Sequence, residues 1–194
     1  LGPEGYAQLD PTYATRCADT ESREFFTGYK SHAIVRHLLE TLARQEPARV
    51  RLETIARTHR DAPVLAVQVG TPSAPPVFVN CAHHAVEILS TEYCFEILSY
   101  LLSPKGKYYT DKFNFTIVPL VNPDGAENFW NLTFKRGRKN GREPNGVDLN
   151  RNYPFFWGMV PGGSSDDPLN SYYRGPAPAS EPEVQGILKL AERE

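Results

Sequence analysis

The sequence predicts an α/β fold in which a β-sheet is sandwiched by helices. Short apolar, β-branched segments of the kind found in buried strands alternate along the chain with longer segments that repeat apolar residues at helical spacing. Turns rich in glycine and proline separate these segments. With 194 residues, of which 40% are hydrophobic and 23% charged, the chain is long enough for one domain with a sizeable core.

The first elements follow from local patterns. Residues 1–24 are polar and weakly patterned, so we assign them to an N-terminal extension and assign residues 25–194 to the single domain. Residues 31–45 repeat apolar side chains at helical spacing and predict the first helix. Residues 50–55 and 64–69 then predict two strands, because β-branched and apolar residues dominate both segments.

The remaining elements continue this order. A pair of prolines leads into the apolar run 77–80, which is typical of a buried strand. Apolar residues recur on helical faces over residues 86–102 and predict a helix of about four turns. Residues 113–121 are β-branched and apolar and predict another central strand. A capping box of sequence Ser-Glu-Pro-Glu starts at Ser180, so a final helix is expected from there to the chain end.

Charge and composition exclude some classes of function. The net charge of −2 argues against general attraction to nucleic acid or to an anionic membrane, and we expect neither as a partner. No apolar run approaches the roughly 20 residues needed to cross a bilayer, and the given start has no signal-peptide pattern. Cys17, Cys81 and Cys94 form no metal-type pair and are odd in number, so they predict no disulfide framework and leave the compartment open.

A candidate metal pair lies where the third predicted strand ends and the next helix begins, which is where open α/β sheets place their ligands. His84 and Glu87 are three residues apart, so both side chains lie on one side if the helix starts here, and an imidazole with a carboxylate suits zinc. His83 competes as the ligand, but it should point to the opposite face if the strand continues to it. The alternative is that both histidines only cap the helix or form local hydrogen bonds.

A basic loop follows the next strand end. Residues 122–125, of sequence Asn-Pro-Asp-Gly, on their own predict a tight turn. Basic side chains then gather at Lys135, Arg136, Arg138, Lys139 and Arg142. Three interpretations fit this cluster: a solvated loop, a nucleic-acid patch, or a set of bidentate donors for a substrate carboxylate and an oxyanion. The overall acidity and the lack of a basic helix face disfavour the nucleic-acid interpretation.

Four segments, taken in order, resemble the zinc carboxypeptidases of the carboxypeptidase A, B and T type. They are His84-Ala85-Val86-Glu87, Val121-Asn122-Pro123-Asp124-Gly125, Arg138-Lys139-Asn140-Gly141-Arg142 and Gly146-Val147-Asp148-Leu149-Asn150-Arg151-Asn152. The resemblance covers residues 25–194. It implies a twisted, mixed but mostly parallel sheet with helices on both faces, incomplete at its C-terminal end.

The resemblance implies a site for one zinc ion. His84 and Glu87 match the first two zinc ligands, and Asp148 matches the carboxylate that orients the histidine. The family takes its third zinc ligand from a histidine well downstream, and its general-base glutamate from farther on, whereas His84 is the last histidine here. We therefore expect the amino-terminal part of a domain, whose remaining part lies beyond residue 194 or on a separate chain.

The resemblance also assigns contacts to the substrate. Asn150 and Arg151 match the pair that binds the terminal carboxylate. Arg142 resembles the residue that polarises the scissile carbonyl and stabilises the oxyanion, and Arg138 resembles the auxiliary arginine before it. The family often spaces these two arginines one residue closer, which leaves their roles exchangeable. It usually has an arginine that contacts the substrate backbone at the position of Val86.

The expected activity is that of a zinc-dependent metallocarboxypeptidase, in which a metal-activated water hydrolyses the last peptide bond of a peptide or protein. One alternative is an inactive, carboxypeptidase-like binding module that keeps carboxylate recognition. Another is a related zinc amidohydrolase that acts on cell-wall peptides. We expect a secreted, extracellular or periplasmic location, although the given chain begins without a signal peptide.

Overall fold

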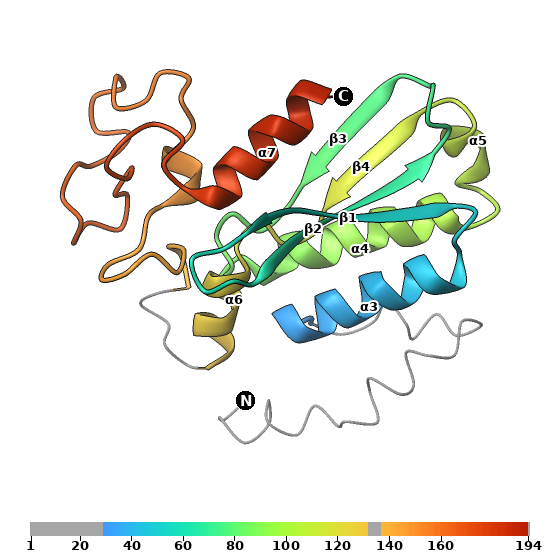
Figure 1. The fold of residues 1–194 in the computed structure, drawn as a ribbon, viewed down its shortest axis with the longest axis horizontal. Helices are drawn as coiled ribbons and strands as arrows, with labels where there is room; N and C mark the ends of the chain where they lie inside the picture. The colour runs from blue at the N-terminus through green and yellow to red at the C-terminus, as the bar shows by residue number, and fades with distance from the viewer. Residues whose placement is uncertain (1–28, 132–136, 194) are drawn as a thin grey trace.

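The computed structural model describes residues 29–131 and 137–193. In chain order the described elements are α3 (His32–Gln45), β1 (Val50–Arg57), β2 (Pro63–Gly70), β3 (Pro76–Asn80), α4 (Ile88–Leu102), α5 (Lys107–Thr110), β4 (Asn114–Val118), α6 (Pro123–Trp130), a 3-10 turn at Leu149–Arg151, and α7 (Pro182–Arg193). Figure 1 shows α3 and α4 on one side of the strands and α7 on the other. The predicted extension, residues 1–24, lies outside the described residues.

The described strands form one four-stranded sheet in the order β1-β2-β4-β3. β1 pairs antiparallel with β2 and β2 pairs antiparallel with β4, whereas β3 and β4 are parallel. The prediction of a mixed sheet is confirmed, but the prediction of a mostly parallel sheet is wrong for these strands. The loop between β1 and β2, residues 58–62, is too short for the crossover that parallel neighbours require, so it forms a hairpin.

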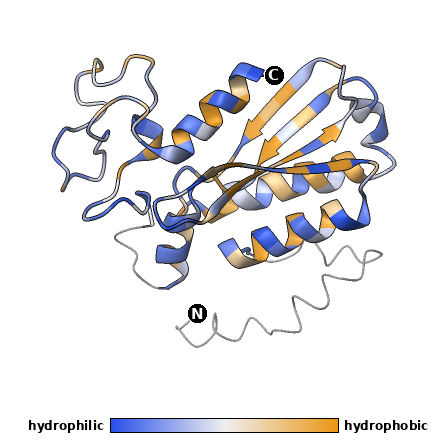
Figure 2. Cartoon of the chain, in the orientation of Figure 1, coloured by the Kyte–Doolittle hydropathy of each residue, from blue (hydrophilic) through white to orange (hydrophobic). Residues whose placement is uncertain are grey.

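β2 shows how one sheet carries helices on both faces. Because successive side chains of a strand point to opposite faces, its apolar residues divide between two hydrophobic clusters. Leu65, Val67 and Val69 join the cluster with α3 and α4, whereas Val64 and Ala66 join the cluster with α7. Figure 2 shows the resulting concentration of apolar residues on the strands. None of the helices in the described part of the chain is long and apolar enough to span a membrane.

Two predictions about the segments around β4 need correction. Residues 123–130 form helix α6 and not only a turn, because the Asn122 side chain caps the helix by accepting a hydrogen bond from the backbone N–H of Gly125 (2.8 Å). The strand predicted over residues 113–121 is shorter, since β4 ends one residue before Pro119. Proline has no backbone N–H with which to continue the ladder.

A buried polar network holds the start of α7. The helix begins at Pro182, two residues after Ser180, which was predicted to cap it, and the Ser180 hydroxyl instead donates to the carboxylate of Glu181 (2.7 Å). Glu181 is fully buried and also accepts hydrogen bonds from Asn140 Nδ2 (2.8 Å) and Arg142 Nη1 (3.1 Å). Although burial favours the neutral acid, these donors lower the pKa of Glu181.

Glu183, in the first turn of α7, is also fully buried. Its Oε2 lies 3.2 Å from Asn140 Nδ2, so one side-chain amide bridges the carboxylates of Glu181 and Glu183. Burial raises the pKa of Glu183 to about 7, and the neighbouring carboxylate of Glu181 acts in the same direction. Glu183 therefore holds a proton up to near-neutral pH, while Glu181 is ionised.

We expect Glu183→Gln to change how stability depends on pH. The pKa of Glu183 rises on folding from 4.5 to about 7, so its contribution to stability is complete below 4.5 and is lost as the pH rises through 7. Glutamine has no such titration and still accepts from Asn140. The free energy of unfolding of the wild type, relative to the variant, should fall by on the order of 2 kcal/mol between pH 5 and pH 8.

Urea unfolding followed by circular dichroism at several pH values measures this difference. Glu192→Gln, an exposed glutamate of the same helix, is the matched control and should follow the wild type at every pH. Parallel curves for wild type and Glu183→Gln would contradict the raised pKa.

Candidate functional site

The candidate site begins where β3 ends. Backbone pairing continues past the strand, since Val121 N donates to the carbonyl of Cys81 (3.0 Å) and Asn122 N donates to the carbonyl of Ala82 (3.2 Å). Ala82 has a φ of 56°, a left-handed conformation that is uncommon for a residue other than glycine. This local backbone change turns the chain out of the strand just before the two adjacent histidines.

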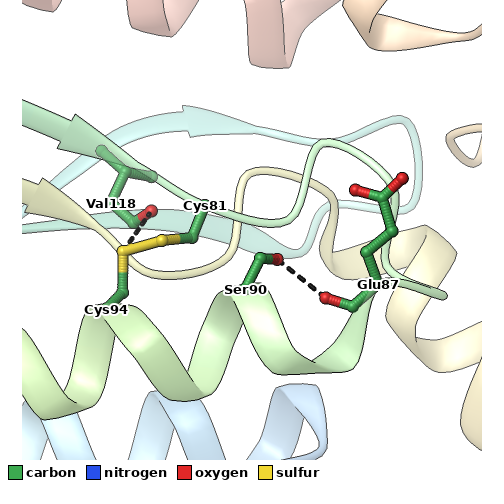
Figure 3. Close-up of a disulfide and its surroundings, with 5 residues drawn as sticks. All are labelled: Cys81, Glu87, Ser90, Cys94 and Val118. Atoms are coloured by element: carbon green, nitrogen blue, oxygen red, sulfur yellow. Dashed lines mark hydrogen bonds between the residues drawn. A yellow bond between two sulfur atoms is a disulfide. The ribbon is translucent and has the colours of Figure 1, made fainter.

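A disulfide between Cys81 and Cys94 joins the end of β3 to α4 (Figure 3). The expectation that the cysteines predict no disulfide is therefore wrong. An odd count shows only that three cysteines cannot all pair within one chain, and Cys17 lies outside the described residues. The bond closes a short loop that contains both His84 and Glu87, and it restricts the conformations open to that loop.

His84 and Glu87 face each other within this loop. The Nδ1 atom of His84 lies 3.0 Å from Oε1 of Glu87. The helix does not begin at residue 86 as predicted: α4 begins at Ile88, and Glu87 is its N-cap. The two residues instead belong to a turn, in which the backbone N–H of Glu87 donates to the carbonyl of His84 (3.0 Å). The Glu87 side chain is 59% exposed, whereas His84 is buried.

Asp148 lies behind His84, on the side away from Glu87. Its Oδ1 lies 2.9 Å from His84 Nε2, and its Oδ2 accepts from Nη2 (2.7 Å) and Nε (3.1 Å) of Arg138. The Asp148 hydrogen bond raises the pKa of His84. Although burial opposes ionisation of Asp148, its contacts with His84 and Arg138 hold the pKa of this carboxyl below its usual range.

The donor atoms fit a zinc ion. Two ligands bound at about 2.0 to 2.2 Å with tetrahedral angles lie about 3.3 to 3.6 Å apart. His84 Nδ1 and Glu87 Oε1 are separated by 3.0 Å, so they need to move apart by only a few tenths of an ångström to bind one ion. Asp148 engages Nε2, which leaves Nδ1 as the ring nitrogen available to a metal. His83 is turned elsewhere, with its Nε2 atom 2.6 Å from the hydroxyl of Tyr153.

A second group of metal-type donors lies at the start of α7. His59, Glu181 and Glu183 each place one ligand atom within 4.8 Å of the others. Sequence reasoning missed this group because no spacing motif connects His59 with the glutamates. The Asn140 amide hydrogen-bonds to both glutamates and so occupies the space between them. We interpret this group as part of the buried network of α7.

The two loop arginines contact different carboxylates. Arg138 uses Nε and Nη2 on Asp148, whereas the side chain of Arg142 donates from Nη1 to Glu181. Lys139 is 6% exposed and donates to the carbonyl of Pro168 (2.8 Å). This loop is therefore packed against the protein and is not a solvated basic segment, although Lys135 and Arg136 lie outside the described residues.

Asp148 also positions the predicted substrate pair. Its Oδ1 accepts from the backbone N–H of Asn150 (3.1 Å) and so caps the 3-10 turn that carries Asn150 and Arg151. Arg151 Nε donates to the carbonyl of Gly163 (2.6 Å). The structure thus brings the predicted metal pair and the predicted carboxylate pair to either side of one aspartate.

Val86, at the position where the similar family usually has arginine, supports the arginine loop. A Cβ atom added to Gly137 would lie 2.7 Å from Val86 Cγ1, so these residues are in close contact. The side chain of Val86 therefore packs under the backbone that leads into Arg138.

Comparisons with known proteins point to one family. The profile of the zinc carboxypeptidase family matches residues 35–194. Carboxypeptidase A6 of Mus musculus is 31% identical over 176 residues, covering 84% of this chain and 39% of that protein. Mast cell carboxypeptidase A of Rattus norvegicus is 34% identical over 164 residues, covering 78% of this chain and 39% of that protein.

Solved structures show the same fold. Bovine thrombin-activatable fibrinolysis inhibitor, in complex with tick carboxypeptidase inhibitor, matches with a TM-score of 0.78 and 27% identity over 87% of this chain and 57% of that chain. Carboxypeptidase A from Helicoverpa armigera matches with a TM-score of 0.77 and 25% identity over 96% of this chain and 48% of that one. The chain thus spans about half the length of its solved relatives. Because the family profile extends over most of the sequence, this chain belongs to the zinc carboxypeptidase family.

Proposed function

We propose that the protein is a zinc-dependent metallocarboxypeptidase that removes the C-terminal residue of peptides or proteins, and that this chain is the amino-terminal part of its catalytic domain. The observation that carries the proposal is the line of contacts from Glu87 through His84 to Asp148. It gives two metal-type donors that face each other and a buried carboxylate that orients one of them. Family membership supports zinc as the metal.

Zinc bound here supplies a Lewis acid and an activated water for hydrolysis of a peptide bond. His84 would hold the ion through Nδ1, because Asp148 holds the opposite ring nitrogen and increases the basicity of the imidazole. Glu87 offers its carboxylate from the N-cap of α4. A third ligand and a general base come from residues beyond 194, so activity requires that part of the protein.

Exposed apolar side chains support this dependence on further residues. Leu89, Tyr93 and Tyr100 on α4 are 57%, 69% and 46% exposed. They lie on one face of the helix, since they are spaced at intervals of about one or two turns. Contiguous exposed apolar surface is typical of a packing interface. We propose that the rest of the catalytic domain covers this face.

The substrate contacts divide between two charges. Arg151 and Asn150 bind the terminal carboxylate, which makes the enzyme an exopeptidase that requires a free C-terminus. Arg142 stabilises the oxyanion and Arg138 is auxiliary. The hydrogen bonds of the described residues support this division, because Arg138 commits two of its nitrogens to Asp148 whereas Arg142 commits one to Glu181.

We further propose an extracellular or periplasmic location. The Cys81–Cys94 disulfide supports it, because such bonds persist in oxidising compartments and are rare in the cytosol. The substrate is then a peptide or protein C-terminus outside the cytosol.

The direct test uses the full-length protein with a peptide that has a free C-terminus and with its C-terminal amide. Mass spectrometry should show release of one amino acid from the free acid, little reaction with the amide, loss of activity with a chelator and recovery with zinc. Zinc binding without hydrolysis would favour the binding-module alternative. Hydrolysis of amide and acid at equal rates would contradict the exopeptidase assignment.

We expect Asp148→Asn to weaken zinc affinity by roughly 10- to 100-fold, because asparagine keeps the shape but loses the charge that makes His84 a better ligand. Competition with a zinc chelator measures the dissociation constant, and circular dichroism verifies folding. Asp111→Asn, an exposed aspartate beyond α5, is the control and should keep wild-type affinity. An unchanged dissociation constant for Asp148→Asn would remove Asp148 from the site.

The arginine variants should fail in different ways. Arg151→Ala removes a contact to a charge already present in the substrate, so it should chiefly raise KM and erase the preference for the free acid. Arg142→Ala removes a contact to a charge that develops in the transition state, so it should lower kcat by roughly 100- to 1,000-fold. Arg138→Ala should lower activity by a smaller factor than Arg142→Ala.

Steady-state kinetics on the acid and the amide for all three variants decides between the assignments. A wild-type kcat for Arg142→Ala, together with a low kcat for Arg138→Ala, would show that the two loop arginines have exchanged roles. Continued rejection of the amide by Arg151→Ala would contradict its role in carboxylate binding.

A further inference from the structure

Residues 163–172, which we call the platform, hold both arginines that border Asp148. The carbonyl of Gly163 accepts from Arg151 Nε (2.6 Å), and the carbonyl of Ser171 accepts from Arg138 Nε (3.3 Å). Each of these contacts engages one edge of a guanidinium group. Asp148 also binds Nε and Nη2 of Arg138 and so fixes the plane of that group. Arg151 has no such carboxylate among its hydrogen bonds in the described part of the chain, since its Nη1 donates to the carbonyl of Asn150 (3.2 Å), so a further contact is needed to hold it relative to Arg138.

The Tyr172 ring supplies that contact to both arginines. Its centroid lies 4.7 Å from Cζ of Arg138 and 5.5 Å from Cζ of Arg151. Both distances are within the roughly 6 Å at which the electron-rich face of an aromatic ring attracts a cation. One ring therefore attracts two guanidinium groups that repel each other, and so keeps both of them near one aromatic side chain.

The backbone around Tyr172 is itself tied to the site. Tyr172 N donates to Oδ1 of Asn170 (2.9 Å), and its carbonyl accepts from Ser165 N (3.0 Å). The carbonyl of the next residue, Tyr173, accepts from Asp148 N (2.9 Å). The ring is thus held at a fixed place relative to Asp148, although it is 49% exposed.

We propose that Tyr172 is a positioning residue that fixes the guanidinium groups of Arg138 and Arg151 relative to each other and so sets the preference of the site for a terminal carboxylate over a neutral amide. This inference rests on the proposed function and adds a specificity determinant to it. Bidentate binding of a carboxylate requires a guanidinium plane held at one angle. Without the Tyr172 ring, Arg151 keeps its charge, but its guanidinium plane is no longer held at that angle.

Three variants separate the ring from the volume it fills. Tyr172→Phe keeps the aromatic face, whereas Tyr172→Leu fills much of the space without it. Tyr108→Leu is the matched control: Tyr108 is 60% exposed and its ring centroid lies 3.9 Å from Lys112 Nζ, so it also pairs with a cation. It belongs to α5, which precedes β4, and so it lies away from the C-terminal ends of β3 and β4 where the site is built.

The first measurement is equilibrium binding of a fluorescent peptide and of its C-terminal amide to the zinc-free, full-length protein. The dissociation constant of the amide divided by that of the free acid reports carboxylate preference without requiring hydrolysis. Tyr172→Leu should reduce this ratio on the order of tenfold, while Tyr172→Phe and Tyr108→Leu keep the wild-type ratio. In the zinc enzyme, Tyr172→Leu should raise KM for the free acid with little change in kcat.

An unchanged ratio in Tyr172→Leu, or an equal loss in Tyr172→Phe, would overturn the role of the ring. A wild-type protein that binds acid and amide equally would overturn it as well. A protein that prefers the acid but fails to hydrolyse it with zinc would contradict the proposed enzymatic activity alone. The binding ratio of Tyr172→Leu would still decide whether the ring positions the two arginines.

Discussion

The hydrogen bond between Asp148 and His84 is the contact on which the rest of the candidate site depends. Removing an ionised carboxylate from water costs several kcal/mol unless strong donors surround it. Asp148 is fully buried, and its donors are Arg138, the backbone N–H of Asn150 and the ring of His84. These donors come from the turn after β3, the loop after α6 and the 3-10 turn. One buried charge therefore requires three segments to meet, and their meeting places the metal pair beside the carboxylate pair.

A second buried carboxylate, that of Glu181, connects this site to α7. Asn152 follows the predicted carboxylate pair and is fully buried, and its Oδ1 accepts from Glu181 N (3.1 Å). Glu181 in turn contacts Arg142. Each loop arginine is thus held by its own buried carboxylate, Arg138 by Asp148 and Arg142 by Glu181. These contacts restrict the rotamers of both arginines before substrate binds, so the arginines lose less conformational entropy on binding.

Local sequence patterns predict the parts of this structure that depend on local physics. The apolar residues of β2 predict a buried strand, and the three-residue spacing of His84 and Glu87 predicts that their side chains converge. That convergence is observed, but through a turn and not through a helix. The segment after Asn122 shows where local information fails. Asn-Pro-Asp-Gly favours both a turn and a helix start, and the side-chain cap at Asn122 decides for the helix.

Contacts between distant segments could not be read from the sequence. The bridge of Asn140 between Glu181 and Glu183 joins a loop to a helix about forty residues later. Tyr172 lies in a stretch rich in glycine and proline that has no periodicity, and its ring meets arginines from two other segments. The Cys81–Cys94 disulfide likewise depends on how α4 packs beneath β3.

X-ray absorption at the zinc edge of the full-length, zinc-loaded protein can test the assignment of His84 and Glu87 as metal ligands, with Asp148 orienting His84. We expect a shell of nitrogen and oxygen ligands at about 2.0 to 2.2 Å. We expect one imidazole fewer in His84→Ala and an unchanged count in His83→Ala, the adjacent histidine that contacts Tyr153. An unchanged imidazole count in His84→Ala, or a loss in His83→Ala, would contradict this assignment.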